Sequence, residues 1–172
     1  NTNVKKCQVI ENDTDTFDSD GRLAHSYECI CYGDTNDNIL KALYEYKIAG
    51  IRTVGAITKN FNEISVGFTR PTEKTVFLKV EIQGIKEVWK DEFKKTIKDI
   101  YLKYIDEVEP NSTIYLYKII GEIYKNVSGI KTLRIKLGDV KYSEREQDYK
   151  LSNKEVAVAN ADDITIEVNL WY

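Results

Sequence analysis

The sequence has few of the residues on which catalytic and metal sites depend. Its 172 residues include one histidine, three cysteines, two prolines and no methionine. A zinc site needs about four ligands, which one histidine without a second cysteine pair does not supply. No apolar run reaches the roughly 20 residues that a membrane-spanning helix needs. The composition therefore argues against a zinc centre and against a transmembrane helix.

The chain also lacks an excess of charge of either sign. It carries 25 basic and 28 acidic residues, a net charge of −3, whereas a nucleic-acid-binding domain shows a basic patch and a high pI. Hydrophobic residues make up 42% and aromatic residues 11% of the chain, enough to build a core. The length allows one domain or two small ones. We therefore expect a folded protein that binds no nucleic acid and enters no membrane.

The N-terminus and the cysteines bear on where the protein folds. Residues 1–6 are polar and too short for a signal peptide. Because no methionine begins the chain, we expect it to be part of a longer polypeptide. Cys29 and Cys31 lie two residues apart in a strand-like run, so they share a face. With Cys7 the count is odd, which favours reduced, buried thiols and is typical of folding in a reducing cytoplasm.

The first 71 residues predict a small α+β unit of order ββαββ. Two strand-like runs flank a turn rich in Asp, Thr, Ser and Gly at residues 12–21. Residues 33–36 offer short polar side chains that can cap a helix, and Gly50 is a suitable stop. A hairpin is expected around residues 60–62. The expected elements are strands 4–10 and 26–32, a helix with the stripe Ile39, Leu40, Leu43 and Tyr46, and strands 54–59 and 63–69.

A boundary is expected at residues 70–72, because Pro71 interrupts both strands and helices. Residues 72–172 then predict a second α+β unit of order βααβββ. Together they give two subdomains with mixed or antiparallel sheets and helices packed on one face. The clearest helix is expected over residues 85–108, with one apolar stripe of Ile85, Trp89, Phe93, Ile97, Ile100, Tyr101, Tyr104, Ile105 and Val108. The other expected elements are strand 75–83, helix 115–126, strand 130–137, a polar loop 138–152, and strands 155–159 and 164–170.

The acidic turn is the best candidate for a metal site. Calcium prefers six to eight oxygen ligands, and four carboxylates fall within eight residues here: Asp13, Asp15, Asp18 and Asp20. Aligning Gly21 with the glycine of an EF-hand loop, however, places Thr16 first and Tyr27 last, where the loop needs acidic side chains. We therefore expect a solvated connection between strands whose Asp side chains accept bonds from nearby backbone N–H groups.

His25 is the only candidate for a histidine general base. Its neighbour Ser26 does not form a pair with it, because adjacent residues of a strand point to opposite faces, and no Gly-x-Ser-x-Gly motif is present. Residues 33–35 lack the Gly-x-x-x-x-Gly-Lys pattern of a phosphate loop, and helix capping explains them. The sequence therefore predicts no catalytic residue, no metal and no cofactor.

The aromatic residues have two interpretations. Trp89, Tyr101 and Tyr104 follow the stripe of the long helix and are expected in the core. The terminal residues 170–172, Leu-Trp-Tyr, either pack as the end of a strand or form a contact surface, since Trp and Tyr are favoured at interfaces. The sequence leaves both open.

Six short motifs occur in order between residues 12 and 71 and resemble those of the baseplate J-like family of contractile phage tails. They are Asn12 to Asp15, Asp18 to Gly21, His25-Ser26, Gly33-Asp34, Gly50 to Gly55 and Phe68 to Pro71. The resemblance continues, less strongly, at residues 126–130, 155–159 and 164–168. The chain departs from the family pattern in having one glycine at Gly33 where two are common, and in lacking a glycine at residues 60–63.

The resemblance implies a structural protein that corresponds to the C-terminal portion of a baseplate wedge component. Such a part joins copies of itself and neighbouring wedge proteins into a ring, in a virion tail baseplate assembled in the bacterial cytoplasm. Phage, prophage and tail-like bacteriocin all use it, and no reaction is implied. The isolated chain is expected to be a monomer or weak dimer. The alternative is a small-molecule or carbohydrate-binding α+β module without catalysis; an enzyme ranks last, because no acid–base or nucleophile constellation is present.

Overall fold

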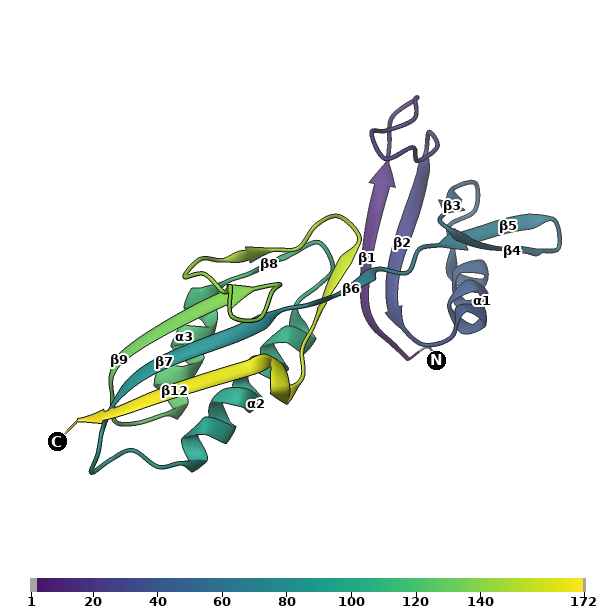
Figure 1. Ribbon diagram of the computed structural model, residues 1–172. Coiled ribbons are helices and arrows are strands. Elements are labelled where there is room, and N and C mark those ends of the chain that lie inside the picture. Colours follow the sequence, from purple (N-terminus) through teal and green to yellow (C-terminus); the bar gives the residue numbers. More distant parts are fainter. Residues whose placement is uncertain (1–2, 172) are drawn as a thin grey trace. The chain divides into compact units, whose positions relative to one another are not determined.

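The computed structural model describes residues 3–171, which fold as two compact units divided between Thr72 and Glu73. Each unit combines helices with small sheets, so the fold class is α+β (Figure 1). The sequence placed this boundary one residue earlier, between Pro71 and Thr72. No helix among the described residues has the length and apolar character needed to cross a membrane.

The first unit contains a three-stranded sheet, a hairpin and one helix. The sheet has the order β1-β2-β3, in which β1 pairs with β2 antiparallel and β2 pairs with β3 in parallel. Strand β3 was not predicted; its pairing with residues 26–28 of β2 makes the unit ββαβββ. The elements are β1 (Val4–Asn12), β2 (Ser26–Gly33), α1 (Asn36–Tyr46), β3 (Arg52–Val54), β4 (Ile57–Phe61) and β5 (Ile64–Phe68).

The helix and hairpin of this unit differ from the prediction in detail. Thr35 caps α1, because its side chain accepts a bond from the N–H of Asn38 at 3.3 Å. The helix ends at Tyr46, four residues before Gly50, and Tyr46 is 83% exposed rather than part of the core stripe. The hairpin turn lies at Asn62 and Glu63, both with positive φ. A two-residue turn of this kind matches the twist of the flanking strands. Both strands therefore begin later than predicted, at Ile57 and Ile64, and the second ends one residue earlier, at Phe68.

The core of the first unit lies between β2, α1 and β5. It consists of Cys29, Cys31, Ile39, Leu40 and Phe68. Apolar burial at this scale is the main favourable contribution to folding. Cys29 and Cys31 are buried free thiols, as expected, whereas Cys7 is exposed on β1, so the prediction that all three cysteines are buried was wrong. The reason is that β1 is the edge strand of the sheet.

The second unit is built on a three-stranded sheet with two helices on one face (Figure 1). The sheet has the order β12-β7-β9, with β12 parallel and β9 antiparallel to the central strand. Two smaller two-stranded sheets pair β8 with β10 and β6 with β11. The elements are β6 (Thr72–Thr75), β7 (Phe77–Ile85), α2 (Glu92–Glu107), β8 (Thr113–Ile114), α3 (Leu116–Asn126), β9 (Ile130–Gly138), β10 (Tyr149–Lys150), β11 (Glu155–Val158), the short 3₁₀ helix η1 (Ala161–Asp163) and β12 (Ile164–Trp171).

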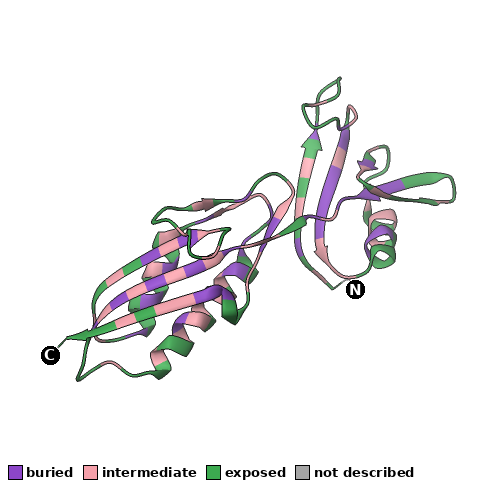
Figure 2. Cartoon of the chain, viewed as in Figure 1, coloured by how far each residue is buried: buried purple, intermediate pink, exposed green. Residues whose placement is uncertain are grey.

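Burial alternates along the central strand, as the sequence pattern predicted. Leu78, Val80 and Ile82 are buried and the residues between them are half-buried (Figure 2). The buried side chains pack against Ile97 and Tyr101 of α2 in one hydrophobic cluster. The period of two that defines a strand with one covered face therefore places the core of this unit on the helix side of the sheet.

The long helix begins later than its apolar stripe suggested. It starts at Glu92, not Ile85, because β7 continues to Ile85, which pairs with Trp171 of β12 and donates its N–H to Gly129 at 2.8 Å. Within the helix Ile97, Tyr101 and Ile105 are buried. Of the rest of the stripe, Val108 is buried, Trp89, Phe93, Ile100 and Tyr104 are partly buried, and Ile85 is exposed. Strand pairing at Ile85 thus overrode the local helical periodicity, and the helix begins seven residues later than predicted.

The short strands β6, β8 and β10 of the second unit and η1 were not predicted. β8 and β10 contain two residues each, and β10 lies in the region expected to be a loop. Their residues show no periodicity because pairing with a distant segment alone defines them. η1 is held by Asn160, whose side chain accepts from the N–H of Asp162 at 2.9 Å.

Candidate functional site

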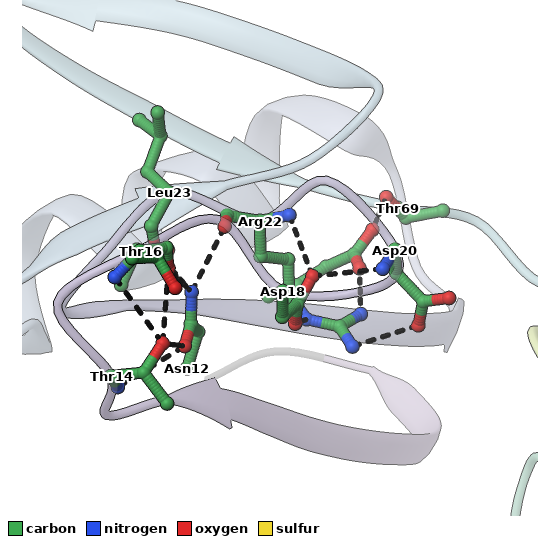
Figure 3. Close-up of polar contacts among 10 residues, drawn as sticks. Asn12, Thr14, Thr16, Asp18, Asp20, Arg22, Leu23 and Thr69 are labelled. Atoms are coloured by element: carbon green, nitrogen blue, oxygen red, sulfur yellow. Dashed lines mark hydrogen bonds and ion pairs between the residues drawn. The ribbon is translucent and has the colours of Figure 1, made fainter.

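The acidic turn between β1 and β2 is organised by a buried amide. Asn12 is 2% exposed, and its Nδ2 donates to three backbone carbonyls: those of Thr16 at 2.8 Å, and of Arg22 and Leu23 at 3.0 Å (Figure 3). Its Oδ1 accepts from the N–H of Thr14 at 3.2 Å and from the Thr14 hydroxyl at 2.7 Å. A satisfied buried amide of this kind fixes the path of the chain.

The carboxylates of the turn meet a cation that the chain itself supplies. The Arg22 side chain is 8% exposed and forms ion pairs with Asp18 at 2.7 Å, Asp20 at 2.8 Å and Glu28 at 3.0 Å (Figure 3). Glu28 also accepts a short hydrogen bond from the Thr69 hydroxyl. Two of the four aspartates that made the turn a metal candidate are therefore occupied by a guanidinium, which binds carboxylates through a rigid fork of donors.

The ionisation of the cluster follows from these contacts. Burial by itself would raise the pKa of Asp18, but backbone N–H groups of Arg22 and Asp20 and the guanidinium outweigh it and lower that pKa. Burial likewise opposes the charge on Arg22, yet its bonds to Glu28, Asp20 and Asp18 raise the pKa of the guanidinium. Among the described residues, no three His, Cys, Asp or Glu side chains are grouped to hold a metal ion.

His25 and Ser26 are not brought together as a catalytic pair. His25 has a left-handed backbone, φ 51°, and its Nε2 lies 2.8 Å from Asp15 Oδ1. Both side chains are exposed, 64% and 95%, so the contact is a surface pair. The Ser26 hydroxyl donates to the Leu23 carbonyl at 2.7 Å. The serine therefore serves the turn, and the geometry offers the histidine no nucleophile to activate.

A second arginine holds the turn between β2 and α1. The Arg70 guanidinium donates to the carbonyl of Asp34 at 2.7 Å, to that of Cys31 at 3.2 Å and, through a short bond, to that of Gly33. It also donates to Asn36 Oδ1 at 2.9 and 3.0 Å. Residues 33–36 thus carry no anion site; their carbonyls face a cation, and Thr35 caps the helix. The arginine of the Phe-x-Arg-Pro motif is a structural clamp.

Two motif glycines allow close backbone approach. A Cβ on Gly55 would lie 2.3 Å from the carbonyl carbon of Phe68, and a Cβ on Gly33 would lie 2.9 Å from the backbone of Asn3 and Lys5. Real Cβ atoms do not tolerate such distances, so only glycine fits either position. Gly55 in this way lets β3 lie against the end of β5.

The sequence identified the acidic turn but missed the residues that organise it. Arg22 and Arg70 were not singled out, and Glu28 was read only as part of a strand. A signal for Arg22 was present: it follows Asp18 by four residues and is the only basic residue of residues 12–24. The buried position of Glu28, 3% exposed, had no such signal, because it depends on Thr69 and Arg22 reaching the same strand face.

An open groove of about 510 Å³ lies between α2 and α3. Its volume falls within the range of small-ligand sites. Gly121 leaves open space where another residue would place a Cβ, and Tyr117, 63% exposed, lines the groove beside it. Ile100 and Tyr104 contribute from α2. The rest of the lining is Ile119 and five charged residues, Lys103, Glu107, Lys118, Glu122 and Lys125.

Large apolar side chains are exposed on both units. On the first unit they are Val9, Phe17, Tyr46, Ile48 and Ile64. On the second they are Ile85, Val88, Tyr115, Tyr117, Tyr124, Val140, Tyr142, Leu170 and Trp171. Leu170 and Trp171 end β12 and are 45% and 53% exposed, so for these two residues both interpretations of the C-terminal aromatics apply. Tyr172 lies outside the described residues.

No model of a known protein family matches this chain, and no curated protein matches it closely enough to indicate a relative.

Proposed function

We propose that this chain is a structural component of the baseplate of a contractile phage tail, or of a phage-tail-like particle. It joins copies of itself and neighbouring wedge proteins through protein–protein contacts, in a virion baseplate assembled in the bacterial cytoplasm. One observation carries the proposal: motif residues far apart in the sequence bond to each other. Arg70 of the last motif holds the carbonyls of Gly33 and Asp34 in the fourth.

The turn that carries the first two motifs is held by bonds to the residues between and after them. Asn12 of the first motif donates to the carbonyls of Thr16, Arg22 and Leu23, and Asp18 of the second accepts from Arg22. These bonds hold a loop and a turn in place, which is a structural role. They support the proposal because positions that carry the resemblance contribute to the same turns.

The exposed side chains favour assembly over catalysis. The aromatic side chains of Phe17, Tyr46, Tyr142 and Trp171 are 53–83% exposed, and aromatic residues are enriched at protein–protein interfaces. The one histidine forms a surface pair with Asp15, and the carboxylates of the turn bind Arg22. We therefore propose a protein without enzymatic activity and without a required metal or cofactor.

The test is binding to baseplate neighbours. The protein is co-expressed with the wedge proteins of its genetic neighbourhood and analysed by sedimentation velocity. We expect the isolated chain to sediment as a monomer or weak dimer and to shift to a heavier species only with a wedge protein. If no wedge protein binds the chain while a sugar or nucleotide binds tightly, the proposal is wrong.

The groove between α2 and α3 supports the alternative, a small-molecule or carbohydrate-binding module. Tyr117 and the open space at Gly121 give a platform on which an apolar or sugar face can stack. Filling the groove with Gly121→Leu distinguishes the two functions. If Gly121→Leu keeps wedge binding but loses the ligand binding of the wild type, the result supports the alternative function for this groove. If neither the wild type nor Gly121→Leu binds a ligand, the alternative function is wrong.

A further inference from the structure

The three cysteines lie on one face of the pair β1–β2. Cys7 is directly opposite Cys31 and Val9 is directly opposite Cys29 in the antiparallel register. Because side chains of a strand alternate between faces, residues 7 and 9 share a face, and so do residues 29 and 31. The register shift in this pair lies between Val4 and Lys6, outside the segment that carries the cysteines.

Backbone bonds show which kind of cross-strand position Cys7 and Cys31 occupy. The N–H of Cys31 donates to the Thr69 carbonyl at 3.0 Å, and its carbonyl accepts from Arg70 at 3.2 Å. Both backbone groups of Cys31 thus point away from β1. Cys7 and Cys31 are therefore a non-hydrogen-bonded pair, in which Cα atoms lie about 4.5 Å apart and side chains are closest. That separation falls within the range of disulfides, about 4.4–6.8 Å.

The two sulfur atoms are already close and unequally accessible. Cys7 Sγ lies 3.3 Å from Cys31 Sγ, and both are free thiols. Cys7 is exposed on edge strand β1, whereas Cys31 is 3% exposed in the core of the unit. A reagent from solution reaches Cys7 first, and Cys31 is then positioned as the second thiol.

We propose that Cys7 and Cys31 are a redox-active pair, which forms an intramolecular disulfide on reaction with a low-molecular-weight disulfide. The thiolate of Cys7 attacks one sulfur of that disulfide, which forms a mixed disulfide and releases one small thiolate. Cys31 then loses its proton to solvent and attacks the Cys7 sulfur, which releases the second small thiol. The protein loses two electrons and two protons, and the oxidant is reduced to two thiols.

The ionisation of the thiols assigns the same order. Hydrogen bonds from the Cys29 and Cys31 thiols lower the pKa of Cys7, and the thiolate is the attacking form. Hydrogen bonds to Cys29 and Cys7, together with burial, raise the pKa of Cys31. Cys29 lies opposite Val9 and therefore diagonal to Cys7. Diagonal residues of an antiparallel pair lie about 7–8 Å apart, farther than the directly opposite pair Cys7 and Cys31. Cys31 is the better-placed partner.

The experiment treats the reduced, folded chain with oxidised glutathione at neutral pH. Intact mass and fragmentation of the linked peptide identify the product. We expect the wild type and Cys29→Ser to lose two hydrogen atoms through a Cys7–Cys31 bond. We expect Cys31→Ser and Cys31→Ala to stop with one glutathione on Cys7, and Cys7→Ser to resist modification. Circular dichroism before the reaction confirms that each variant is folded.

The product has a second readout that does not depend on mass. Closing the chain between residues 7 and 31 restricts the unfolded state, so the melting temperature of the oxidised protein should rise by several degrees and return on reduction. The proposal is overturned if the wild type keeps glutathione on Cys7 without closing. It is also overturned if Cys31→Ala still closes, or if the bond forms only after denaturation. None of these three outcomes bears on wedge binding, which is measured separately.

Discussion

The guanidinium of Arg70 donates to the backbone carbonyl of Asp34 at 2.7 Å, although 36 residues separate the two. Asp34 has a left-handed backbone, φ 54°, and its Oδ1 accepts from the N–H of Thr35 at 2.7 Å. Two side chains thus hold the turn before α1. The Asp34 carboxylate accepts from a backbone N–H of the turn, and the Arg70 guanidinium donates to its carbonyls. The sequence predicted helix capping at residues 33–36 and no phosphate loop, and the structure adds backbone carbonyls that accept from the Arg70 guanidinium.

Replacing this arginine tests the clamp. Arg70→Lys keeps the charge but not the fork of donors, and Arg70→Ala removes both. We expect Arg70→Ala to lower the free energy of unfolding by about 1.5–3 kcal/mol, the cost of losing hydrogen bonds to a charged group, and Arg70→Lys to lower it by less. Urea denaturation measures both. Arg52, exposed on β3, is the matched control, and an equal effect of Arg52→Ala would contradict the clamp.

The core of the second unit gives a prediction with a built-in comparison. Ile97 is fully buried against β7, whereas Phe93, one turn earlier, is only partly buried and contacts Trp89 edge-on at 5.5 Å. Ile97→Ala should therefore cost about 2–5 kcal/mol, and Phe93→Ala should fall below the range of about 3–5 kcal/mol for a fully buried phenylalanine. Thermal melts measure both. A smaller loss for Ile97→Ala than for the exposed Ile48→Ala would refute the packing.

The fold was predictable where local pattern and tertiary pairing agree. The alternation of residues 75–83 predicted β7, and capping chemistry at residues 33–36 predicted the start of α1. The prediction failed where a distant segment decides the structure. Residues 85–91 follow a helical stripe, yet Trp171 and Gly129 pair with Ile85 and keep it in the sheet. The two-residue strands β8 and β10 exist only because they pair with each other.

The candidate site was predictable only at the level of composition. The acidic turn was visible, and its expected role as a strand connection agrees with the bonds that Asp18 accepts from the N–H groups of Asp20 and Arg22, both at 2.9 Å. The identity of the cation was not visible. Glu28 joins the cluster because β2 places it on the same face as the folded-back turn, and register of that kind is not written in a short window of sequence.

Gly55 tests the close approach of two backbone segments. A Cβ at this position would lie 2.3 Å from Phe68 C and 2.4 Å from Phe68 O, and Phe68 is itself fully buried, so neither partner can shift freely. We expect Gly55→Ala to destabilise the first unit by at least the roughly 1–3 kcal/mol typical of core overpacking. Gly21→Ala is the control for space, since nothing lies within 4 Å of a Cβ there, although its positive φ adds some strain. Chemical denaturation compares the two.

Acid should destabilise the first unit through Asp18. Contacts with Arg22 and Asp20 lower the pKa of this carboxyl below its ordinary value of 3.8. A carboxyl with a lower pKa in the folded state stabilises the fold at pH values above its unfolded pKa, and this contribution is lost as the pH falls through the folded pKa. The free energy of unfolding should therefore decline from about pH 5 downward. Asp18→Asn should flatten this decline, whereas Asp99→Asn on the exposed face of α2 should not.

The ion pairs of Arg22 predict that the acidic turn is stable without a metal ion. In the wild type the guanidinium already forms ion pairs with Asp18, Asp20 and Glu28, so a divalent cation would have to displace a buried side chain that cannot leave without breaking three ion pairs. We expect neither EDTA nor millimolar Ca²⁺ to change the melting temperature, because only a ligand that binds the native state raises its stability. Arg22→Gln should lower the free energy of unfolding by about 3–5 kcal/mol, since it removes one partner of the buried ion pair with Glu28, which is 3% exposed. The free energy of unfolding of Arg22→Lys should lie between those of the wild type and Arg22→Gln, because lysine restores the positive charge without the fork of guanidinium donors. If Ca²⁺ raised the melting temperature of the wild type by several degrees, the carboxylates would bind Ca²⁺ in preference to Arg22. The purely structural role of the turn would then be wrong.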